Sequence, residues 1–175
     1  MDGTDRLTIE PRAVAHAPGL FAALDHPDVG RFIGGPDVTT LEALVERIVA
    51  VDAADPVEWG EIWLNWVVML RDPARTVIGR VEATVYAGVD LADIAYVFGP
   101  RWAGNGYATE ATAWMLDQLR DHHGVATVYA TTDPANGPST RLLERLGFER
   151  NDLPDDGGAR SYDPGDHIHR RRLDR

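Results

Sequence analysis

The chain has 175 residues, of which 44% are hydrophobic, a size and composition that suffice for one domain with a full core. It contains no cysteine, which excludes disulfides, thiolate metal sites and a cysteine nucleophile. The net charge is -11 and all 17 basic residues are arginine, a balance that disfavours nucleic acids and anionic membranes as partners. No stretch has the apolar length of a secretion signal or a membrane span, so a cytoplasmic location is expected.

The first third of the chain predicts a strand followed by helices. Residues 6–12 form a short strand that ends at a proline, and residues 13–33 form one or two helices interrupted by further prolines. Thr39 and Glu42 have the spacing of a capping box, so a helix is expected from there to about residue 52.

Three tryptophans, Trp59, Trp63 and Trp66, follow within eight residues. Two interpretations remain open. The rings fill the core, as large aromatic side chains usually do, or they form a rim that binds a cationic amine together with Glu58 and Glu61.

The rest of the chain alternates strands and helices. Residues 65–71 and 77–86 predict a hairpin, and a fourth strand over about residues 93–98 precedes a helix over about residues 107–122 with an apolar stripe. The remaining elements are a strand over 125–132, a helix over 138–146, a strand from Phe148 and a last strand over 167–173. We therefore expect residues 1–175 to form a single α/β (α+β) domain, mostly antiparallel, with parallel pairing only between the fourth and fifth strands.

The turn between the fourth strand and the next helix carries the most specific pattern, Arg101-x-x-Gly104-x-Gly106. A glycine turn that opens a helix can direct several free N–H groups, and the positive end of the helix dipole, at one anion. The dinucleotide fingerprint would need a glycine where Thr109 stands, and a P-loop would need a lysine.

A second pattern lies roughly 30 residues further on. Residues 136–148 read N-x-x-S-x-x-L-L-E-R-x-G-F. The turn resembles the [RQ]-x-x-G-x-[GA] loop of the GNAT N-acetyltransferase superfamily, and the second pattern resembles the later motif of that superfamily. Together with the strand before the turn and the residues between the motifs, the resemblance spans residues 94–148, about a third of the chain.

The resemblance implies the GNAT fold, with six to seven strands, about four helices and a splayed fourth and fifth strand. It implies that acetyl-CoA is the cosubstrate, with its pyrophosphate on the amides after residue 101 and its pantetheine arm along the fourth strand. The cofactor-binding residues expected on this basis are Val97, Phe98, Arg101, Trp102, Ala103, Gly104, Asn105, Gly106, Tyr107, Ala108, Thr109, Asn136 and Ser139. No metal is expected, because the paired histidines lack acids at ligand spacing.

Two carboxylates are candidates for the base that deprotonates the amine. The stretch from Ala92 to Tyr96 resembles the A-E-I-x-[FY] strand of histone acetyltransferases, in which the Glu is the general base, and this places Asp93 in that role. Because Asp is one methylene shorter, a water relay is the expected route. Glu82 is the second candidate.

The superfamily commonly protonates the leaving thiolate with a Tyr, at a position that Leu143 holds here. This leaves Ser139, Asn136 or water as the proton source, although Ser139 could equally be a helix cap. Ser139 and Leu143 are shared with the RimJ/RimL branch, the ribosomal-protein N-terminal acetyltransferases.

The sequence thus indicates an N-acetyltransferase in which the amine attacks the thioester directly, because no cysteine or serine elbow offers a covalent route. Two acceptor classes stay open, a protein N-terminal α-amine and a small cationic amine. The alternative function is a non-catalytic acyl-CoA-binding module. The sequence leaves a homodimer open and does not identify the acceptor.

Overall fold

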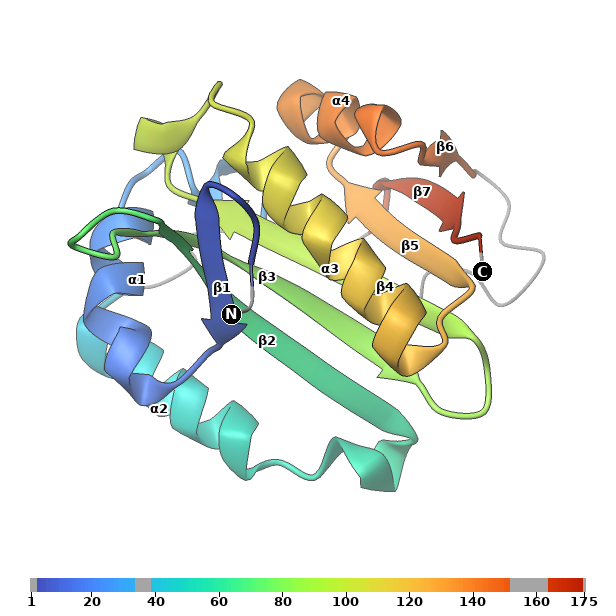
Figure 1. Ribbon diagram of the computed structural model, residues 1–175, viewed down its shortest axis with the longest axis horizontal. Coiled ribbons are helices and arrows are strands. Elements are labelled where there is room, and N and C mark those ends of the chain that lie inside the picture. Colours follow the sequence, from blue (N-terminus) through green and yellow to red (C-terminus); the bar gives the residue numbers. More distant parts are fainter. Residues whose placement is uncertain (1–2, 34–38, 152–163, 175) are drawn as a thin grey trace.

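The computed structural model describes residues 3–33, 39–151 and 164–174. Within these residues, seven strands form one mixed sheet in the order β1-β2-β3-β4-β5-β7-β6 (Figure 1). The strands are β1 (Leu7–Pro11), β2 (Glu61–Leu70), β3 (Val77–Tyr86), β4 (Leu91–Phe98), β5 (Thr127–Thr132), β6 (Glu149–Arg150) and β7 (His167–Arg172). The α-helices are α1 (Ala17–Leu24), α2 (Leu41–Ala53), α3 (Tyr107–His123) and α4 (Gly137–Arg145).

The pairing of the strands confirms the mixed sheet. β4 and β5 are the parallel neighbours, and every other neighbouring pair is antiparallel. The parallel pair is joined by α3, as a crossover between parallel strands requires. The antiparallel order of β1 to β4 is therefore interrupted at β5, and the crossover to β5 begins with the glycine turn that enters α3.

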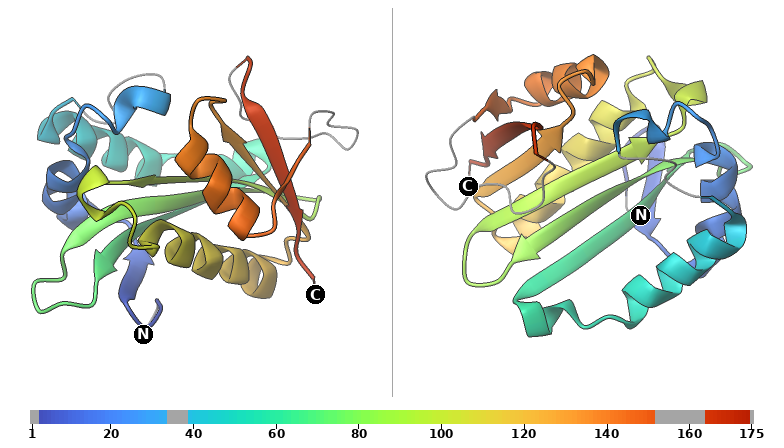
Figure 2. Two further views of the ribbon diagram at one scale, coloured as in Figure 1. Left: turned by 90° about the horizontal axis from the view of Figure 1, so that it is seen from above. Right: turned by 180° about the vertical axis from the view of Figure 1, so that it is seen from behind.

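The helices cover both faces of the sheet. α3 and α4 lie on one face, and α1 and α2 lie on the other face toward the β1 end (Figure 2). Each face has its own apolar cluster. Leu20 and Ile48 pack with Val67 and Met69 on the face of α1 and α2. Successive residues of a strand point to opposite faces, so one run of β2 can serve both clusters.

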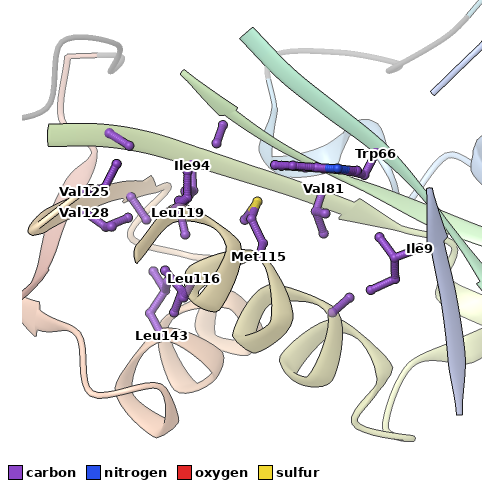
Figure 3. Packing of buried hydrophobic residues seen from close by; sticks show 14 of the residues in the cluster. Ile9, Trp66, Val81, Ile94, Met115, Leu116, Leu119, Val125, Val128 and Leu143 are labelled. Carbon is purple, nitrogen blue, oxygen red and sulfur yellow. The ribbon is translucent and has the colours of Figure 1, made fainter. Parts of the chain in front are cut away.

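Figure 3 shows the larger cluster, which lies between the sheet and α3. Met115, Leu116 and Leu119 of α3 are fully or almost fully buried against strand residues that include Val81 and Val128. These three positions follow the helical period, which gives α3 one apolar face toward the sheet.

The start of α2 differs from the prediction. Its N-cap is Thr40, whose Oγ1 accepts a hydrogen bond of 3.1 Å from the N–H of Ala43. Thr40 has an extended backbone and Leu41 is the first helical residue, so the predicted cap at Thr39 is wrong. Glu42 consequently lies one position too early to complete a capping box.

The tryptophan-rich stretch belongs to β2, which begins at Glu61, four residues before the predicted start at residue 65. Trp66 is buried, with its ring edge-on to Trp114 at 5.5 Å between centroids. Trp59 is 61% exposed and packs against Trp63 at 5.4 Å. The core interpretation therefore holds for Trp66 but not for Trp59.

In the part of the chain that the structure describes, no helix has the length and hydrophobicity that crossing a membrane requires.

Candidate active site

The ladder between β4 and β5 is short. It pairs Leu91 with Thr127, Ala92 with Val128 and Asp93 with Tyr129. The remainder of β4, Ile94–Phe98, continues beyond this ladder and pairs with β3 on its other side. The two parallel strands are therefore splayed, and Val97 and Phe98, two predicted contacts of the pantetheine arm, lie in the separated part of β4.

A hollow of about 170 Å³ lies at the point where the two strands diverge. It is lined by Glu82, Ala83 and Thr84 of β3, by Asp93, Ile94 and Ala95 of β4, and by Tyr129, Ala130 and Thr131 of β5. Both predicted bases, Asp93 and Glu82, thus line the same hollow.

The glycine turn leads directly into α3. Gly104 and Gly106 both have φ of 79°, a left-handed conformation that glycine adopts without steric cost, and Gly106 is the N-cap of α3. The first hydrogen bond of the helix runs from Glu110 N–H to the carbonyl of Gly106, at 3.0 Å. The N–H groups of the first helical turn, at residues 107–109, accordingly have no carbonyl within the helix, which is the arrangement that binds phosphate.

The amides before Gly104 have other partners. Trp102 N–H donates to the carbonyl of Gly99 and Ala103 N–H donates to that of Pro100, each at 3.1 Å. The predicted cradle started at residue 102, whereas the N–H groups of Trp102 and Ala103 are used within the turn itself. The amides that the turn can present to an anion begin at Gly104.

Side chains of the turn mostly shape the turn. The amide nitrogen of Asn105 donates to the carbonyls of Trp102 (3.1 Å) and Ala103 (3.2 Å). Arg101 is exposed, and its guanidinium lies 5.9 Å from the centre of the Trp102 ring. Among these predicted residues, Arg101 therefore has the side chain most accessible to an anionic ligand.

The segment before β1 fastens the turn to the sheet. Arg6 donates to Glu110 (Nε to Oε2, 2.7 Å) and to the carbonyl of Asn105 (3.1 Å), and its guanidinium lies 4.8 Å from the centre of the Tyr107 ring. Thr4 also donates to Glu110. Burial opposes ionisation of Glu110, but the hydrogen bonds from Thr4 and Arg6 together lower the pKa of its carboxyl. Arg6 and Glu110 were not recognised from the sequence, because the contact joins residues about a hundred positions apart.

The start of α4 brings the second motif to the other side of the splay. Asn136 is the N-cap of α4, and its side-chain oxygen accepts a hydrogen bond of 3.2 Å from Ser139 N–H. The hydroxyl of Ser139 lies 2.7 Å from the hydroxyl of Tyr96 on β4. Burial raises the pKa of Tyr96 to about 12, even though the hydrogen bond to Ser139 lowers it. Leu143, at the position of the usual tyrosine acid, is fully buried in the core.

Sequence reasoning missed Tyr96 as a site residue. The alternation along β4 places it on the face opposite Asp93, and its hydroxyl reaches across to α4. The signal that could have found it is its position in the A-E-I-x-[FY] pattern, where only the acidic residue was considered.

The two candidate bases have different partners. Asp93 accepts a hydrogen bond of 2.8 Å from the hydroxyl of Tyr86 at its Oδ2. Glu82 forms an ion pair with Arg12 (Oε1 to Nη1, 3.1 Å) and a second, closer one with Arg80. The carboxylate of Glu82 is thus engaged by two guanidinium groups, and Oδ2 of Asp93 accepts from a neutral hydroxyl.

Among residues 3–33, 39–151 and 164–174, no group of three or more His, Asp or Glu side chains is arranged to hold a metal ion. Thr132 and His169, which are buried, are hydrogen bonded to each other at 3.0 Å.

Comparison with known sequences identifies the domain. A family model described as an acetyltransferase (GNAT) domain matches residues 6–149. The uncharacterized N-acetyltransferase YnaD of Bacillus subtilis (strain 168) is 32% identical over 83 residues, which are 47% of this chain and 48% of YnaD. The uncharacterized N-acetyltransferase YoaA of the same organism is 25% identical over 148 residues, which are 84% of this chain and 81% of YoaA. The chain thus spans about half the length of YnaD and most of YoaA.

Solved structures share the fold. A GNAT-family acetyltransferase from Bacillus anthracis superposes with a TM-score of 0.76 at 22% identity, over 98% of this chain and 97% of that one. Mycobacterium smegmatis RimJ, solved in complex with CoA-disulfide, superposes with a TM-score of 0.74 at 17% identity, over 95% of this chain and 81% of that one. The domain match and the fold together show that the chain belongs to the GNAT acetyltransferase family, a family of acetyl-CoA-dependent enzymes.

Proposed function

We propose that the protein transfers the acetyl group of acetyl-CoA to a primary amine by direct attack in a ternary complex. The observation that carries the proposal is the adjacency of three features. The amides at the start of α3 can hold a pyrophosphate, the separated part of β4 can hold an extended arm, and a hollow with two carboxylates opens where β4 and β5 diverge.

The residues of this chain fit the cosubstrate in the roles that the family motif implies. Gly104 to Thr109 would receive the pyrophosphate, with Arg101 able to add a charged contact. Apart from Gly104 itself and its two chain neighbours, no described residue has a heavy atom within 4 Å of the place that a Cβ of Gly104 would occupy, so this approach is open. The backbone near Val97 and Phe98 would orient the thioester, and an N–H there would stabilise the oxyanion; one such donor contributes about 3 kcal/mol.

The acceptor amine must be neutral before it can attack. We assign the removal of its proton to Asp93, directly or through water, because Glu82 already balances two arginines. The amine nitrogen forms a bond to the carbonyl carbon, the bond from that carbon to sulfur breaks, and the sulfur leaves with the electron pair. Starting from the ammonium, two protons leave the nitrogen: Asp93 takes the first before the attack and releases it to solvent, and the second leaves as the amide forms. The thiolate takes up one proton to become the thiol, so the reaction releases one proton overall.

Tyr96 and Ser139 can supply that proton. Their hydroxyls are 2.7 Å apart; Tyr96 lies on β4 and Ser139 lies near the start of α4, the helix that follows β5. With a pKa of about 12, Tyr96 is protonated at neutral pH; it can return a proton to Ser139 after the transfer and is itself reprotonated by solvent. The pair thus replaces the tyrosine acid that Leu143 excludes from α4.

Replacing Ser139 with alanine, or Tyr96 with phenylalanine, should lower kcat by roughly tenfold each. The effect is smaller than the usual contribution of an acid, roughly 100-fold or more, because a thiol of pKa near 8.5 leaves fairly easily. The double variant should be no slower than the slower single variant, since the two hydroxyls act in one path. Below pH 10, kcat of the native protein should show no alkaline decline from Tyr96. Thr140→Ala, next to Ser139, is the control; additive losses would contradict a shared path.

The proposed activity is tested by thiol release. Purified protein is mixed with acetyl-CoA and a panel of N-terminal peptides, polyamines and aminoglycosides, and the free thiol is measured. Thiol release with at least one amine, together with an N-acetylated product by mass spectrometry, is the expected result. Binding of CoA by calorimetry without thiol release on any amine would support the alternative, an acyl-CoA-binding module.

We also propose that the chain belongs to the RimJ/RimL branch of the family. Ser139 and Leu143 support this assignment, and the shared fold of Mycobacterium smegmatis RimJ is consistent with it.

A further inference from the structure

A second hollow includes Arg47 and Val51 of α2 in its lining, so it lies on the sheet face that carries α1 and α2. Its volume is about 260 Å³. It is lined by Arg12, Arg47, Val51, Trp63, Asn65, Arg80, Glu82, Ala83 and Thr84. Three arginines in one hollow are unexpected in a chain whose net charge is -11.

The side chain of Arg12 is the key feature, since only 2% of it is exposed. One of its nitrogens, Nη1, is paired with Glu82. Its Nε and Nη2 are buried and have no hydrogen-bond acceptor among the described residues. Leaving a buried donor unsatisfied costs about 1–3 kcal/mol, and more when the group is charged. Two guanidinium donors in the wall of a hollow therefore indicate a site for an acceptor group that the protein itself does not provide.

The charges around Arg12 favour an anion. Burial lowers the pKa of Arg12, and the nearby Arg80 and Arg47 lower it further, while Glu82 and Asp52 act in the opposite direction. The guanidinium nevertheless stays protonated, because its ordinary pKa lies above 12. Three arginines and one glutamate line the hollow, an excess of arginine that favours a carboxylate as the ligand.

The two hollows are adjacent, because Glu82, Ala83 and Thr84 belong to the lining of both. On β4, Ala95 pairs with Glu82 and Asp93 pairs with Thr84. One small molecule can therefore extend along this face from Arg12 toward Asp93. The volumes of about 260 and 170 Å³ together reach the lower end of small-molecule sites, roughly 300–1,000 Å³.

We infer that the acceptor is a small amine that also carries a carboxylate. The carboxylate binds Arg12 and Arg47 in the second hollow, and the amine reaches Asp93 in the first. This inference rests on the proposed acetyl transfer and narrows its acceptor. It favours this acceptor over both classes that the sequence left open, a purely cationic amine and a protein N-terminal α-amine of the RimJ/RimL type, because arginines outnumber acidic residues in the lining of the hollow.

The test compares matched amines in the thiol-release assay. The probes are ω-amino acids of two to six carbons and the corresponding uncharged amides. We expect the best acid to exceed its amide at least tenfold in kcat/KM, since a hydrogen bond to a charged group contributes about 1.5–3 kcal/mol. Equal rates for acid and amide at every length would overturn the inference. So would a peptide with an uncharged N-terminal residue that reacts as well as the best acid.

Two variants test whether the second hollow causes the preference for acid over amide. Arg47→Gln changes an exposed residue of α2, so the fold should be kept, and it should reduce the preference for acid over amide by about fivefold or more. Arg12→Gln should abolish the preference, with circular dichroism to establish that the variant is folded. Arg145→Gln, the same change of charge on exposed α4 at the other face, should leave the preference unaltered. Equal loss on acid and amide in Arg47→Gln would contradict the assignment of the hollow.

The same experiment separates the two proposals. If no amine of either kind releases thiol although calorimetry shows CoA binding, the proposed acetyl transfer fails. If the amides of the ω-amino acids are acetylated as fast as the acids themselves, acetyl transfer stands and the inference about the hollow fails.

Discussion

Replacing Gly104 with tryptophan is expected to lower the affinity for CoA and kcat/KM at least 100-fold while the protein remains folded. Gly104 has φ of 79° and an open approach to the start of α3. An indole there would cover the amides that receive the pyrophosphate. Loss of two charge-assisted hydrogen bonds, at about 1.5–3 kcal/mol each, accounts for the size of the effect. Isothermal calorimetry with CoA and the thiol-release assay measure it.

The control for this variant is Gly88→Trp. Gly88 lies in the turn between β3 and β4 and also has φ of 79°. Apart from Gly88 itself and its two chain neighbours, no described residue has a heavy atom within 4 Å of a Cβ placed there. Both substitutions therefore introduce the same backbone strain, about 1–2 kcal/mol, at an open position. Gly88→Trp should retain CoA binding, and a comparable loss in both variants would show that strain, not the cradle, is responsible.

The second large effect is expected for Asp93→Asn. At pH 7, kcat/KM on an alkylamine of pKa near 10 should fall about 100-fold, because a general base usually contributes roughly 100- to 10,000-fold. In the variant, log kcat/KM should then rise by one for each pH unit until the pKa of the amine, since solvent must remove the proton. An α-amine of pKa near 8 should lose less, because a larger fraction of it is already neutral at pH 7.

Asp117→Asn, the same substitution on the exposed side of α3, is the control and should leave the pH profile unchanged. If Asp93→Asn keeps the native pH profile on the alkylamine, Asp93 is not the base. Glu82→Gln would then be the next variant to measure, although its carboxylate also holds Arg12 and Arg80.

Local patterns made most of the fold predictable. β3 has the bounds that its alternation indicated, residues 77–86, and α3 begins at Tyr107 as the glycine turn indicated. The cap of α2 was misplaced by one residue because two adjacent threonines offer the same hydroxyl, and only the backbone geometry of Thr40 distinguishes them. Where one residue type recurs, the local pattern does not fix the register.

The site was predictable only in part. The turn and the second motif are each a continuous stretch of sequence, so their residues could be named in advance. The arginine hollow is assembled from Arg12, Arg47 and Arg80, which come from three segments and meet only through the register of β2 and β3 and the packing of α2. Tyr96 and Ser139 likewise meet across 43 positions. The net charge of -11 favoured a cationic ligand, whereas three arginines and one glutamate line this hollow; a sum over the chain does not show such a local excess.

The identity of the cations around Glu82 has a chemical consequence for an acyl-transfer enzyme. A lysine ammonium beside a bound thioester could lose its proton and become acylated in place of the true acceptor. Arg12, Arg47 and Arg80 hold their charge in a delocalised guanidinium that stays protonated, so none of them offers a competing nucleophile. If the thioester binds as proposed, the arginines of this hollow can therefore hold an anionic ligand without becoming acylated themselves.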